Sequence, residues 1–543
     1  MKNAIGVFLL AAAVIVTGWW WLGQPVAMPS APLAAGEKLE CVSYAPYRDN
    51  ETPINLSTRV EPWRIEEDLK QLAPVTGCVR TYSVHQGLDQ VAPIAQKLGL
   101  KVMQGLWIGR DKAFNQVQID GAIAIARKYP DAIRALVVGN EVLLRGEMSP
   151  AALAEVVREV KRQVPASVPV TYADVWEFWL RSPELVEAVD FVTIHILPYW
   201  EDLPIPAATA ADHVVSIRHQ VAKSFPGKDI MIGEVGWPSA GRMREGALPS
   251  LSNQARVIQD VIAAAKKEGF HLNVIEAFDQ PWKRQFEGTV GGHWGLLGAA
   301  SRAPKFGWGR PVSDHAQWKL MAAAGVALAA VIIGAAFILI GNGVAPVYSG
   351  YVSLQVGVAA VVGGGLLGLT LEQAMVESFG SAGLIRSAML LFVAVGCPVI
   401  GAVVLGRGLA IPSLARVLGR KTERPSGWPE FALGVMFAAV IVIALQTALG
   451  LVFDARYRDF PAAALTAAIV PFGLLMIGRL RAEGRRPVAE TVAAIVLAMS
   501  AIYIVYNETF ANWQAVWTAG ALLLLAVILE RATILEREPA ARG

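Results

Sequence analysis

Charged side chains are scarce in this 543-residue chain. They make up 17% of the residues, 54% are hydrophobic, and the mean hydropathy is +0.44. Soluble domains of average usage carry about 25% charged residues, so this composition excludes a protein surrounded by water on all sides. Most acidic residues lie between Glu37 and Asp314, and charge-free runs dominate the sequence beyond residue 320. We therefore expect a water-facing block followed by a membrane region.

Cysteine is equally scarce, and three residues are too few for a disulfide-rich framework. Cys397 lies in the middle of an apolar run. Cys41 and Cys78 each begin a β-branched, strand-like segment of the water-facing block. A bridge between them is geometrically feasible if the two strands are neighbours. Two buried thiols are the alternative.

Signals for metals and for nucleotides are also missing. The seven histidines form no ligand-spaced cluster, and there is no glycine-rich phosphate loop. We therefore expect no metal and no cofactor, and a nucleotide-sugar synthase is disfavoured. Arginine clusters at residues 407–424 and 479–486 fall between apolar runs and do not interleave with aromatic residues. They indicate membrane topology rather than binding to nucleic acid.

Long apolar runs are what the chain has in abundance. A transmembrane helix needs roughly 20 apolar residues. Eight runs qualify, at residues 4–22, 320–340, 351–371, 387–406, 431–453, 460–478, 491–507 and 509–529. The first run ends in Trp19-Trp20-Trp21 and predicts an uncleaved signal anchor, with a cleaved signal peptide as the alternative.

The orientation follows from arginine and lysine, which collect in cytoplasmic loops. Eight spans that start inside place the acidic block outside and the C-terminus in the cytoplasm. We predict an inner-membrane, multi-pass protein in three parts. Residues 1–36 are an anchor and linker, residues 37–314 a periplasmic catalytic domain, and residues 315–543 a seven-span membrane domain.

The water-facing block alternates between strand-like and helix-like segments. Its β-rich runs lie at residues 41–47, 78–84, 101–108, 133–142, 169–175, 190–197, 229–237 and 273–278. Helical patterns such as 149–164 and 253–268 separate them. Parallel strands need crossover helices, and eight of them can close on themselves. The prediction is an α/β fold, a (β/α)8 TIM barrel, followed by an all-α polytopic membrane domain.

In such a barrel the chemistry belongs to the C-terminal ends of the strands. Two of the predicted strands end in a segment that contains a glutamate, Val138-Gly139-Asn140-Glu141 and Gly233-Glu234-Val235-Gly236. Paired carboxylates are what glycosidic cleavage requires, as acid/base and as nucleophile or base. Carboxyl groups about 5–5.5 Å apart imply retention of configuration, and about 6.5–9.5 Å imply inversion.

The run from Gly233 to Ser239, Gly-Glu-Val-Gly-Trp-Pro-Ser, resembles the nucleophile motif of glycoside hydrolase family 17, the β-1,3-glucanase and glucanosyltransferase family. Residues 138–141 resemble its acid/base strand, and residues 276–283 with 293–296 its eighth strand and closing loop. The resemblance covers about residues 39–310. One departure is Gln280, where fungal members usually carry a second glutamate.

The resemblance implies a retaining enzyme with Glu141 as acid/base, Glu234 as nucleophile and Asn140 as partner of the sugar 2-hydroxyl. Tyr199 is similar to an aromatic residue that hydrogen-bonds the nucleophile in related barrels. Further candidate substrate-binding residues are Tyr44, Arg80, Tyr82, Trp107, Tyr172, Trp237, Asp279, Trp282 and Lys283.

The membrane region bears on the choice between transfer and hydrolysis. An enzyme that remodels a polymer as it emerges from a synthase gains from proximity, whereas a degradative enzyme gains little. Family members with a similar hydrophobic half are linked to β-glucan synthesis in Gram-negative bacteria. We therefore favour a glucanosyltransferase that remodels, branches or cyclises periplasmic β-glucan. An endo-β-1,3-glucanase is the alternative, and a glucan-binding module or a transporter is disfavoured. Expected partners are β-1,3-glucan, the bilayer and, as a candidate, a membrane glucan synthase.

Overall fold

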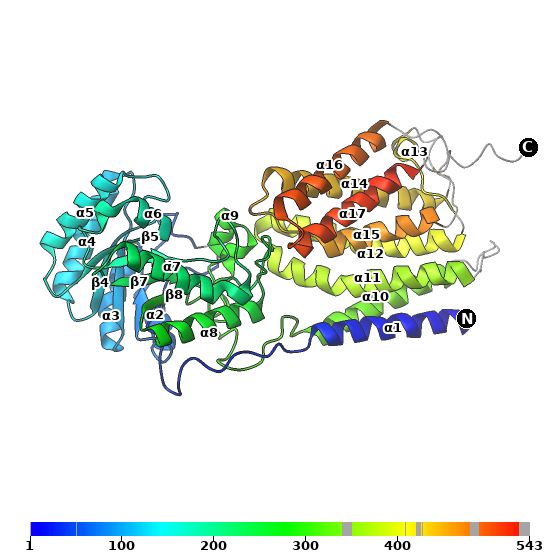
Figure 1. Cartoon of the computed structure of the whole chain (residues 1–543). Helices are drawn as coiled ribbons and strands as arrows, with labels where there is room; N and C mark the ends of the chain where they lie inside the picture. Colours follow the sequence, from blue (N-terminus) through cyan, green and yellow to red (C-terminus); the bar gives the residue numbers. More distant parts are fainter. Residues whose placement is uncertain are drawn as a thin grey trace, which may run out of the picture. The chain divides into compact units, whose positions relative to one another are not determined.

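The computed structural model describes residues 2–49, 51–338, 350–407, 409–419, 425, 427–477 and 488–531. The chain forms two compact units (Figure 1). The barrel unit comprises Val26–Gly241 and Gly246–Val312, and the helical unit comprises Met1–Pro25, Arg242–Glu245 and Ser313–Gly543. The last residues of the predicted spans 320–340 and 460–478, and all of the arginines at 420–424 and 479–486, lie outside the described residues.

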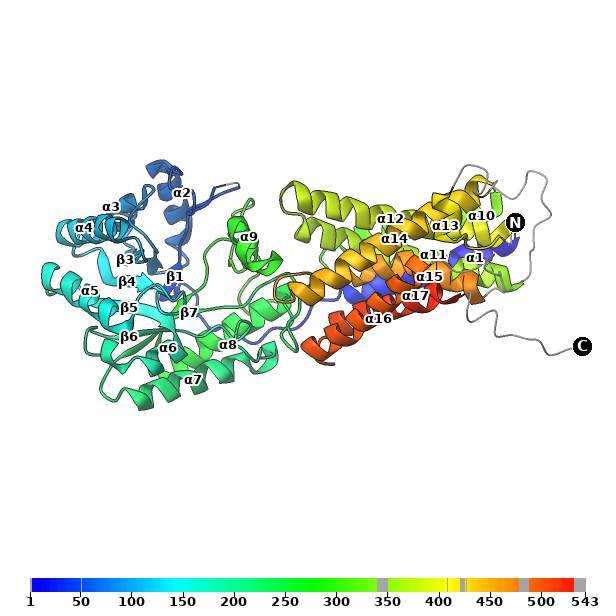
Figure 2. The same ribbon diagram turned by 90° about the horizontal axis from the view of Figure 1, so that it is seen from above.

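The barrel unit is built on eight parallel strands that close in sequence order. Figures 1 and 2 show the labelled strands side by side in this unit. The first and last strands pair through Cys41 with Asn273 and Val42 with Val274, which completes the ring. This confirms the predicted (β/α)8 barrel. The strands are β1 Cys41–Ser43, β2 Cys78–Arg80, β3 Lys101–Leu106, β4 Ile133–Asn140, β5 Val170–Val175, β6 Val192–His195, β7 Ile230–Val235 and β8 His271–Val274.

A helix follows each strand, and all but the short α9 pack around the ring (Figure 2). They are α2 Pro62–Leu72, α3 Val91–Lys97, α4 Lys112–Lys128, α5 Pro150–Gln163, α6 Trp176–Arg181, α7 Ala210–Ser224, α8 Leu251–Glu268 and α9 Arg284–Glu287. Local sequence sets their ends. The hydroxyl of Ser149 accepts the N–H of Ala152 and Pro150 opens the first turn of α5. Gly269, with a φ of 68°, ends α8.

A disulfide joins Cys41 at the start of β1 to Cys78 at the start of β2, with a Cα–Cα distance of 4.3 Å. The bridge, rather than two thiols, is therefore what the structure contains. It packs with a layer of apolar side chains inside the barrel, Met103, Ala135, Val137, Ala173 and Met231. Because the interior is filled at the N-terminal end of the strands, polar chemistry has space only toward their C-terminal ends.

The helical unit consists of α1 Lys2–Leu22, α10 Trp318–Ile338, α11 Gly350–Glu377, α12 Gly380–Arg407, α13 Leu414–Leu418, α14 Trp428–Phe453, α15 Ala462–Ile477, α16 Val488–Glu508 and α17 Trp513–Leu529. Among the described residues, six helices are long and apolar enough to cross a membrane, namely α1, α10, α11, α12, α14 and α16. The apolar helices α15 and α17 have 16 and 17 residues. All eight predicted spans thus fall on apolar helices.

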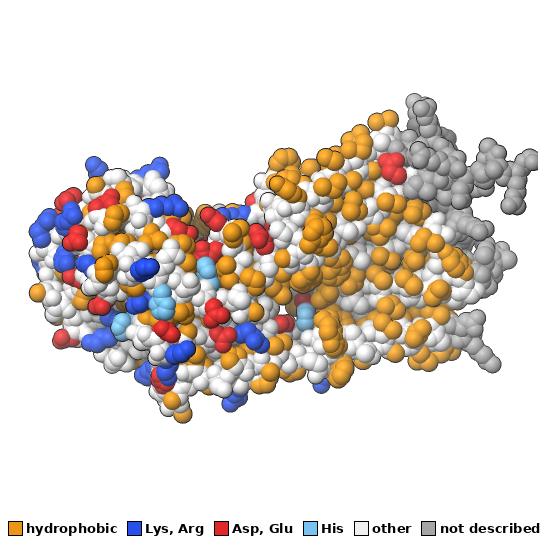
Figure 3. Space-filling view, in the orientation of Figure 1, with side chains coloured by type: hydrophobic (Ala, Val, Ile, Leu, Met, Phe, Trp, Pro, Cys, Tyr) orange, Lys and Arg blue, Asp and Glu red, His pale blue; other side chains and the backbone are white. Residues whose placement is uncertain are grey.

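Apolar side chains cover the outside of these helices, as Figure 3 shows. Leu10 is 68% exposed, Ile385 60% and Tyr506 84%. A patch of this extent is foreign to a water-facing surface. Six long apolar helices and their apolar exterior indicate a multi-pass membrane protein, while its orientation and compartment stay predictions.

The N-terminal helix α1 is part of this unit. Trp19 is 1% exposed, and its indole N–H donates to the carbonyl of Gly365 on α11 (3.1 Å). The barrel unit lies between α1 and α10 in the chain. At its two ends Val26 and Val312 form an antiparallel bridge, with N–O distances of 2.7 and 3.0 Å.

Candidate active site

The barrel brings Glu141 and Glu234 together, although 93 positions separate them in the sequence. Glu141 directly follows β4, and Glu234 lies near the end of β7. A carboxylate oxygen of each and a ring nitrogen of His195, on β6, all lie within 4.8 Å of one another. Glu234 is 5% exposed and Glu141 is half-buried. Two carboxyl groups therefore share one small volume at the C-terminal ends of the strands.

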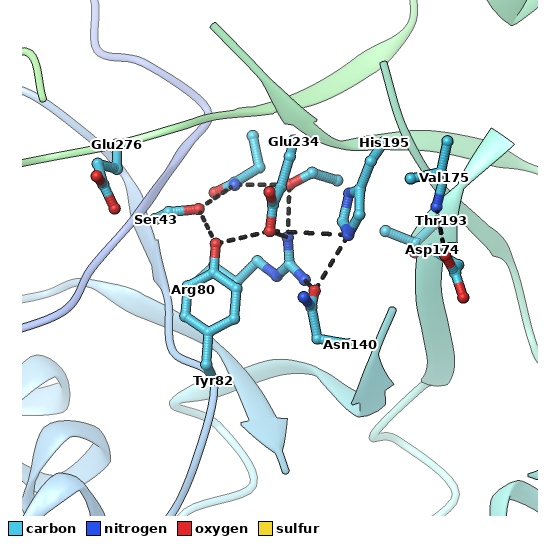
Figure 4. A network of polar contacts seen from close by, with 12 residues as sticks. Ser43, Arg80, Tyr82, Asn140, Asp174, Val175, Thr193, His195, Glu234 and Glu276 are labelled. Carbon is cyan, nitrogen blue, oxygen red and sulfur yellow. Dashed lines mark hydrogen bonds and ion pairs between the residues drawn. The ribbon is translucent and has the colours of Figure 1, made fainter. Parts of the chain in front are cut away.

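The carboxylate of Glu234 is held by two donors (Figure 4). The guanidinium of Arg80 donates to its Oε1 at 3.0 Å, and the hydroxyl of Tyr82 donates to the same oxygen at 2.8 Å. Arg80 also donates to the carbonyl of Gly233 (2.7 Å) and to Oδ1 of Asn140 (2.6 Å). Arg80 thus ties together the two strand ends that carry the glutamates.

His195 completes this network from β6. Its Nε2 lies 3.1 Å from Oδ1 of Asn140 and 3.7 Å from Oε1 of Glu234. Both oxygens can only accept, so Nε2 carries the hydrogen. Burial lowers the pKa of His195 to about 4, opposed by Glu234 and assisted by Arg80, so the ring is neutral near pH 7.

A second layer of polar contacts supports Glu234. The Oγ of Ser43 accepts hydrogen bonds from the hydroxyl of Tyr82 and from Nδ2 of Asn273, both at 2.8 Å. Asn273 also donates to the carbonyl of Gly233 at 2.8 Å. Residues of β1, β2 and β8 thereby fix the nucleophile candidate in one position.

The environment keeps Glu234 ionised. Burial raises the pKa of its carboxyl, but His195, Arg80, Lys283 and the hydroxyl of Tyr82 outweigh burial and hold the pKa below its usual range. Because His195 is neutral near pH 7, the positive charges that act there are those of Arg80 and Lys283. Glu234 is therefore an anion at neutral pH.

The environment of Glu141 acts in the opposite direction. Burial, followed by the negative charges of Glu234 and Asp174, raises its pKa to about 8, while Arg145 lowers it. Glu141 is therefore protonated at neutral pH. Two carboxyl groups in one volume have their pKa values pushed apart, so that one is an acid and the other an anion at neutral pH.

An eighth-strand acid lies beside the pair. Lys283 pairs with Glu276 at 2.9 Å, and this contact outweighs burial and raises the pKa of the Lys283 ammonium. Burial raises the pKa of Glu276 to about 7. Gln280, the departure noted above, donates to the carbonyl of Ala45 (2.9 Å) and accepts from the indole of Trp282 (2.9 Å). At this position the amide therefore makes structural hydrogen bonds.

The other predicted substrate residues fall into two groups. Tyr82, Trp107, Trp282 and Lys283 remain partly exposed. Tyr44, Tyr172, Tyr199, Trp237 and Asp279 are buried. The Tyr44 hydroxyl donates to Asp68 (3.1 Å), the Trp237 indole to the carbonyl of Leu248 (3.1 Å), and Asp279 pairs with Lys305 (2.9 Å). Tyr199 lies edge-on to Trp237 with ring centroids 6.1 Å apart. For these buried residues, contact with a substrate stays a prediction.

Sequence reasoning did not single out His195, Ser43, Asn273 or Asp174. Their common signal is position, because each lies at or near the C-terminal end of a strand. Figure 4 shows Glu276 and Asp174 on opposite sides of the network around Glu234.

Glu141, His195 and Glu234 are also the three side chains that could offer ligand atoms to a metal ion. Oε1 of Glu234 already accepts hydrogen bonds from Arg80 and Tyr82, and Nε2 of His195 lies 3.7 Å from it. The positive charge of the buried Arg80 guanidinium would repel a divalent cation at this position. His195 presents an N–H to the site rather than a lone pair that could bind a metal. This donor set fits a charged carboxylate better than a metal centre.

Several known glycoside hydrolases are similar to this chain. Residues 41–295 match the family model of the BtgE/BtgC glycoside hydrolase domain. A glucan 1,3-β-glucosidase of Candida albicans is 28% identical over 251 residues, covering 42% of this chain and 82% of that protein. A glucan 1,3-β-glucosidase of Saccharomyces cerevisiae is 25% identical over 253 residues, covering 43% and 80%.

A solved structure of a glycoside hydrolase family 17 β-1,3-glucanosyltransferase from Rhizomucor miehei is similar, with 29% identity and a TM-score of 0.44. It matches 49% of this chain and 95% of its own. An active-site mutant of that enzyme has been solved in complex with laminaritriose. The barrel of this chain is therefore a glycoside hydrolase domain, distantly homologous to glucan 1,3-β-glucosidases.

Proposed function

We propose that this protein is a retaining β-glucanosyltransferase that acts on β-1,3-glucan. One observation carries the mechanism: the acidic Glu141 and the ionised Glu234 approach within 4.8 Å. Carboxylate oxygens this near to each other favour the closely spaced pair of a retaining enzyme, which forms a covalent intermediate, over the wider pair that admits a water between the carboxyls. The β-1,3-glucan specificity is carried over from the named relatives.

In the first step a carboxylate oxygen of Glu234 attacks the anomeric carbon and forms an ester bond. The glycosidic C–O bond breaks, and its electron pair goes to the leaving oxygen. That oxygen takes the proton of Glu141. Arg80 and Tyr82 hold the attacking carboxylate, and Asn140, fixed by Arg80, lies beside it to bind a sugar hydroxyl.

In the second step Glu141, now ionised, removes a proton from an incoming hydroxyl. The hydroxyl oxygen bonds to the anomeric carbon, and the ester bond to Glu234 breaks. A sugar hydroxyl as acceptor gives transfer, and water gives hydrolysis. Partly exposed rings such as Trp107 and Trp282 are platforms on which an acceptor sugar could stack.

The membrane unit supports transfer. Fixing the barrel at a membrane raises the local concentration of a polymer that emerges there. We further propose that the barrel faces the periplasm, next to a membrane glucan synthase, and that the C-terminus is cytoplasmic. A reporter fused at Arg416 should then report the cytoplasm, and an external signal would overturn this topology. The matching site at residue 344 lies outside the described residues.

Product analysis tests the activity directly. Detergent-solubilised full-length protein is incubated with end-labelled laminari-oligosaccharides, and products are identified by mass spectrometry and linkage NMR. Longer, branched or cyclic products would establish transfer and name the new bond. Products that are only shorter would make the protein an endo-β-1,3-glucanase.

Glu234→Ala is the control, because it removes the nucleophile, and a melting curve checks that the variant folds without the buried pair to Arg80. Full activity of this variant would refute the assignment of Glu234. No turnover by the wild type would favour a glucan-binding module.

A further inference from the structure

The turn that carries Glu141 has an unusual backbone. Glu141 has a φ of 54°, in the left-handed region, which costs a non-glycine residue about 1–2 kcal/mol. Gly139 before it and Gly146 after it also have positive φ values, 87° and 62°. A residue keeps such a conformation only where its neighbours over-determine it. The contacts that hold this turn therefore decide where the carboxyl group of Glu141 lies.

Asp174, on β5, supplies those contacts on one side. It is 0% exposed. Its Oδ2 accepts the backbone N–H groups of Leu143 (3.1 Å) and Leu144 (3.4 Å), the second and third residues after Glu141. Its Oδ1 accepts the N–H of Val175 (2.7 Å). Asp174 thus caps the first turn after Glu141 as an N-cap carboxylate would, but from a different strand.

Tyr172 joins Asp174 in this contact. Its hydroxyl donates to Oδ2 of Asp174, and its oxygen accepts the N–H of Leu143 at 3.1 Å. Every group that meets the Asp174 carboxyl is a donor, so the carboxyl needs no proton of its own. Burial raises the pKa of the Asp174 carboxyl, and the four hydrogen-bond donors around it oppose that rise and favour the carboxylate form.

Arg145 holds the other side of Glu141. Its guanidinium donates to the carbonyl of Asn140, which precedes Glu141, and to the carbonyl of Ile108 (2.8 Å). It lies over the ring of Trp107, 4.2 Å from the centroid. The residues on both sides of Glu141 are thus fixed by charged, partly or fully buried side chains.

We propose that Asp174 is a positioning residue for the acid/base glutamate, one that fixes the turn so that Glu141 holds its proton toward the glycosidic oxygen. Asp174 itself exchanges no proton and touches no reacting atom. The inference rests on the proposed function. A merely structural cap could be a neutral serine or asparagine, which is less costly to bury than a charge.

The charge of Asp174 adds what a neutral cap could not. The charged groups that act on Glu141 are Glu234 from β7, Asp174 from β5, Glu287 from α9 and Arg145 from its own turn, while His195 from β6 is neutral. After burial and Glu234, Asp174 is the next cause that raises the pKa of Glu141. Removing this charge should lower that pKa.

The test compares two substrates of the full-length protein. The first is a laminari-oligosaccharide, whose leaving alcohol needs the proton of Glu141. The second is a dinitrophenyl β-laminaribioside, whose leaving phenolate needs none. The measured quantity is kcat/KM, which reports the step that forms the glucosyl-enzyme. Asp174→Asn removes the charge at constant size. Asp190→Asn is the matched control, because Asp190 also accepts a β5 backbone N–H, that of Val170 at 2.8 Å, at the opposite end of the strand.

We expect Asp174→Asn to lower kcat/KM about 10²-fold on the oligosaccharide, the cost of a misplaced catalytic group. On the aryl substrate kcat/KM should fall less than about 5-fold. The alkaline limb of the pH profile of kcat/KM on the oligosaccharide should move about 0.5 pH unit or more to lower pH. Asp190→Asn should behave as the wild type. Equal losses on both substrates, or an alkaline limb that does not move, would overturn the proposal.

If Asp174→Asn does not fold, Tyr172→Phe provides the second variant. It removes one hydrogen bond to Asp174 and one to Leu143 but keeps the charge. Tyr172→Phe should lower kcat/KM on the oligosaccharide more than on the aryl substrate, and the alkaline limb should stay at its wild-type pH. An equal loss on both substrates would overturn the proposal. A wild type that turns over neither substrate would refute the proposed function itself, whereas an active wild type with an unselective variant refutes only the role of Asp174.

Discussion

Replacing Arg80 with methionine removes the positive charge that contacts Glu234. The guanidinium lies 3.0 Å from Oε1, and the exposed fractions of the two side chains are 1% and 6%. An opposite charge at this range lowers a carboxyl pKa by about 1–3 units. Lys283 and the Tyr82 hydroxyl remain in Arg80→Met, so a rise of about 2 units in the pKa of Glu234 is expected, equivalent to about 2.7 kcal/mol.

The sign of the pH effect follows from the proposed role of Glu234 as the nucleophile. The nucleophile must be ionised, so activity is present above its pKa and lost as the pH falls through it. In Arg80→Met the acidic limb of kcat/KM against pH should therefore move to higher pH. Breaking a buried pair on one side also costs about 3–5 kcal/mol of stability. Thermal unfolding should show this loss.

The assay is the pH profile of kcat/KM on a laminari-oligosaccharide, together with a melting curve of the same preparation. Arg158→Met is the control, because Arg158 makes an exposed pair with Glu155 whose side chains are 40% and 68% exposed. Surface pairs of this kind contribute at most about 1 kcal/mol, so neither measurement should change. Arg80→Lys, which keeps a charge without the planar fork, should fall in between. A folded Arg80→Met with an unmoved acidic limb would refute this account of Glu234.

Two further predictions follow. Because the proposed acid Glu141 must donate a proton and its pKa is about 8, activity should be present below that pH and lost as the pH rises through it. The alkaline limb near pH 8 should be absent from the profile of Glu141→Ala on an activated aryl substrate. A wild-type alkaline limb below pH 6 would contradict the assignment. The disulfide closes a separation of 37 residues, which by chain entropy is worth roughly 4 kcal/mol, so Cys41→Ala/Cys78→Ala should melt well below the wild type, and equal melting temperatures would contradict this value.

Much of the barrel could be predicted from local sequence. Parallel strands buried on both faces are continuous apolar runs, and β4 Ile133–Asn140 is buried along nearly its whole length. The glutamates at the strand ends stood out because their neighbours are small or aromatic. The strands are shorter than predicted, since β1 ends at Ser43 where residues 41–47 were expected. Beyond Ser43 the chain is still apolar, but it leaves the ring to form the rim.

The network of hydrogen bonds around Glu234 could not be predicted in this way. Arg80 and Glu234 are 154 positions apart, and neither sequence context hints at the other. The neutral state of His195 likewise depends on burial and on the charge of Arg80, which only the closed ring provides. Positions could be predicted strand by strand, but charge states depend on side chains contributed by different strands.

Hydropathy also misplaced helix starts, and the last run is an example. The run 509–529 begins at Thr509, but α17 begins at Trp513. Thr509 has a φ of 61°, and the side chain of Asn512 accepts the N–H of Ala515 at 3.1 Å. A cap of this kind ends the irregular segment and starts the helix. Apolar character alone carries no information about such a cap.

The place of α1 in the helical unit has a consequence for biosynthesis. Its packing partners α10 and α11 leave the ribosome only after about 295 further residues, which at about 5–20 residues per second takes roughly 15–60 s. During that interval Trp19 has no Gly365 to bind, while the entire barrel emerges and can close. The Val26–Val312 bridge forms only when the last barrel residues arrive, just before α10. Translation order would thus let the enzyme domain mature before its membrane bundle is assembled.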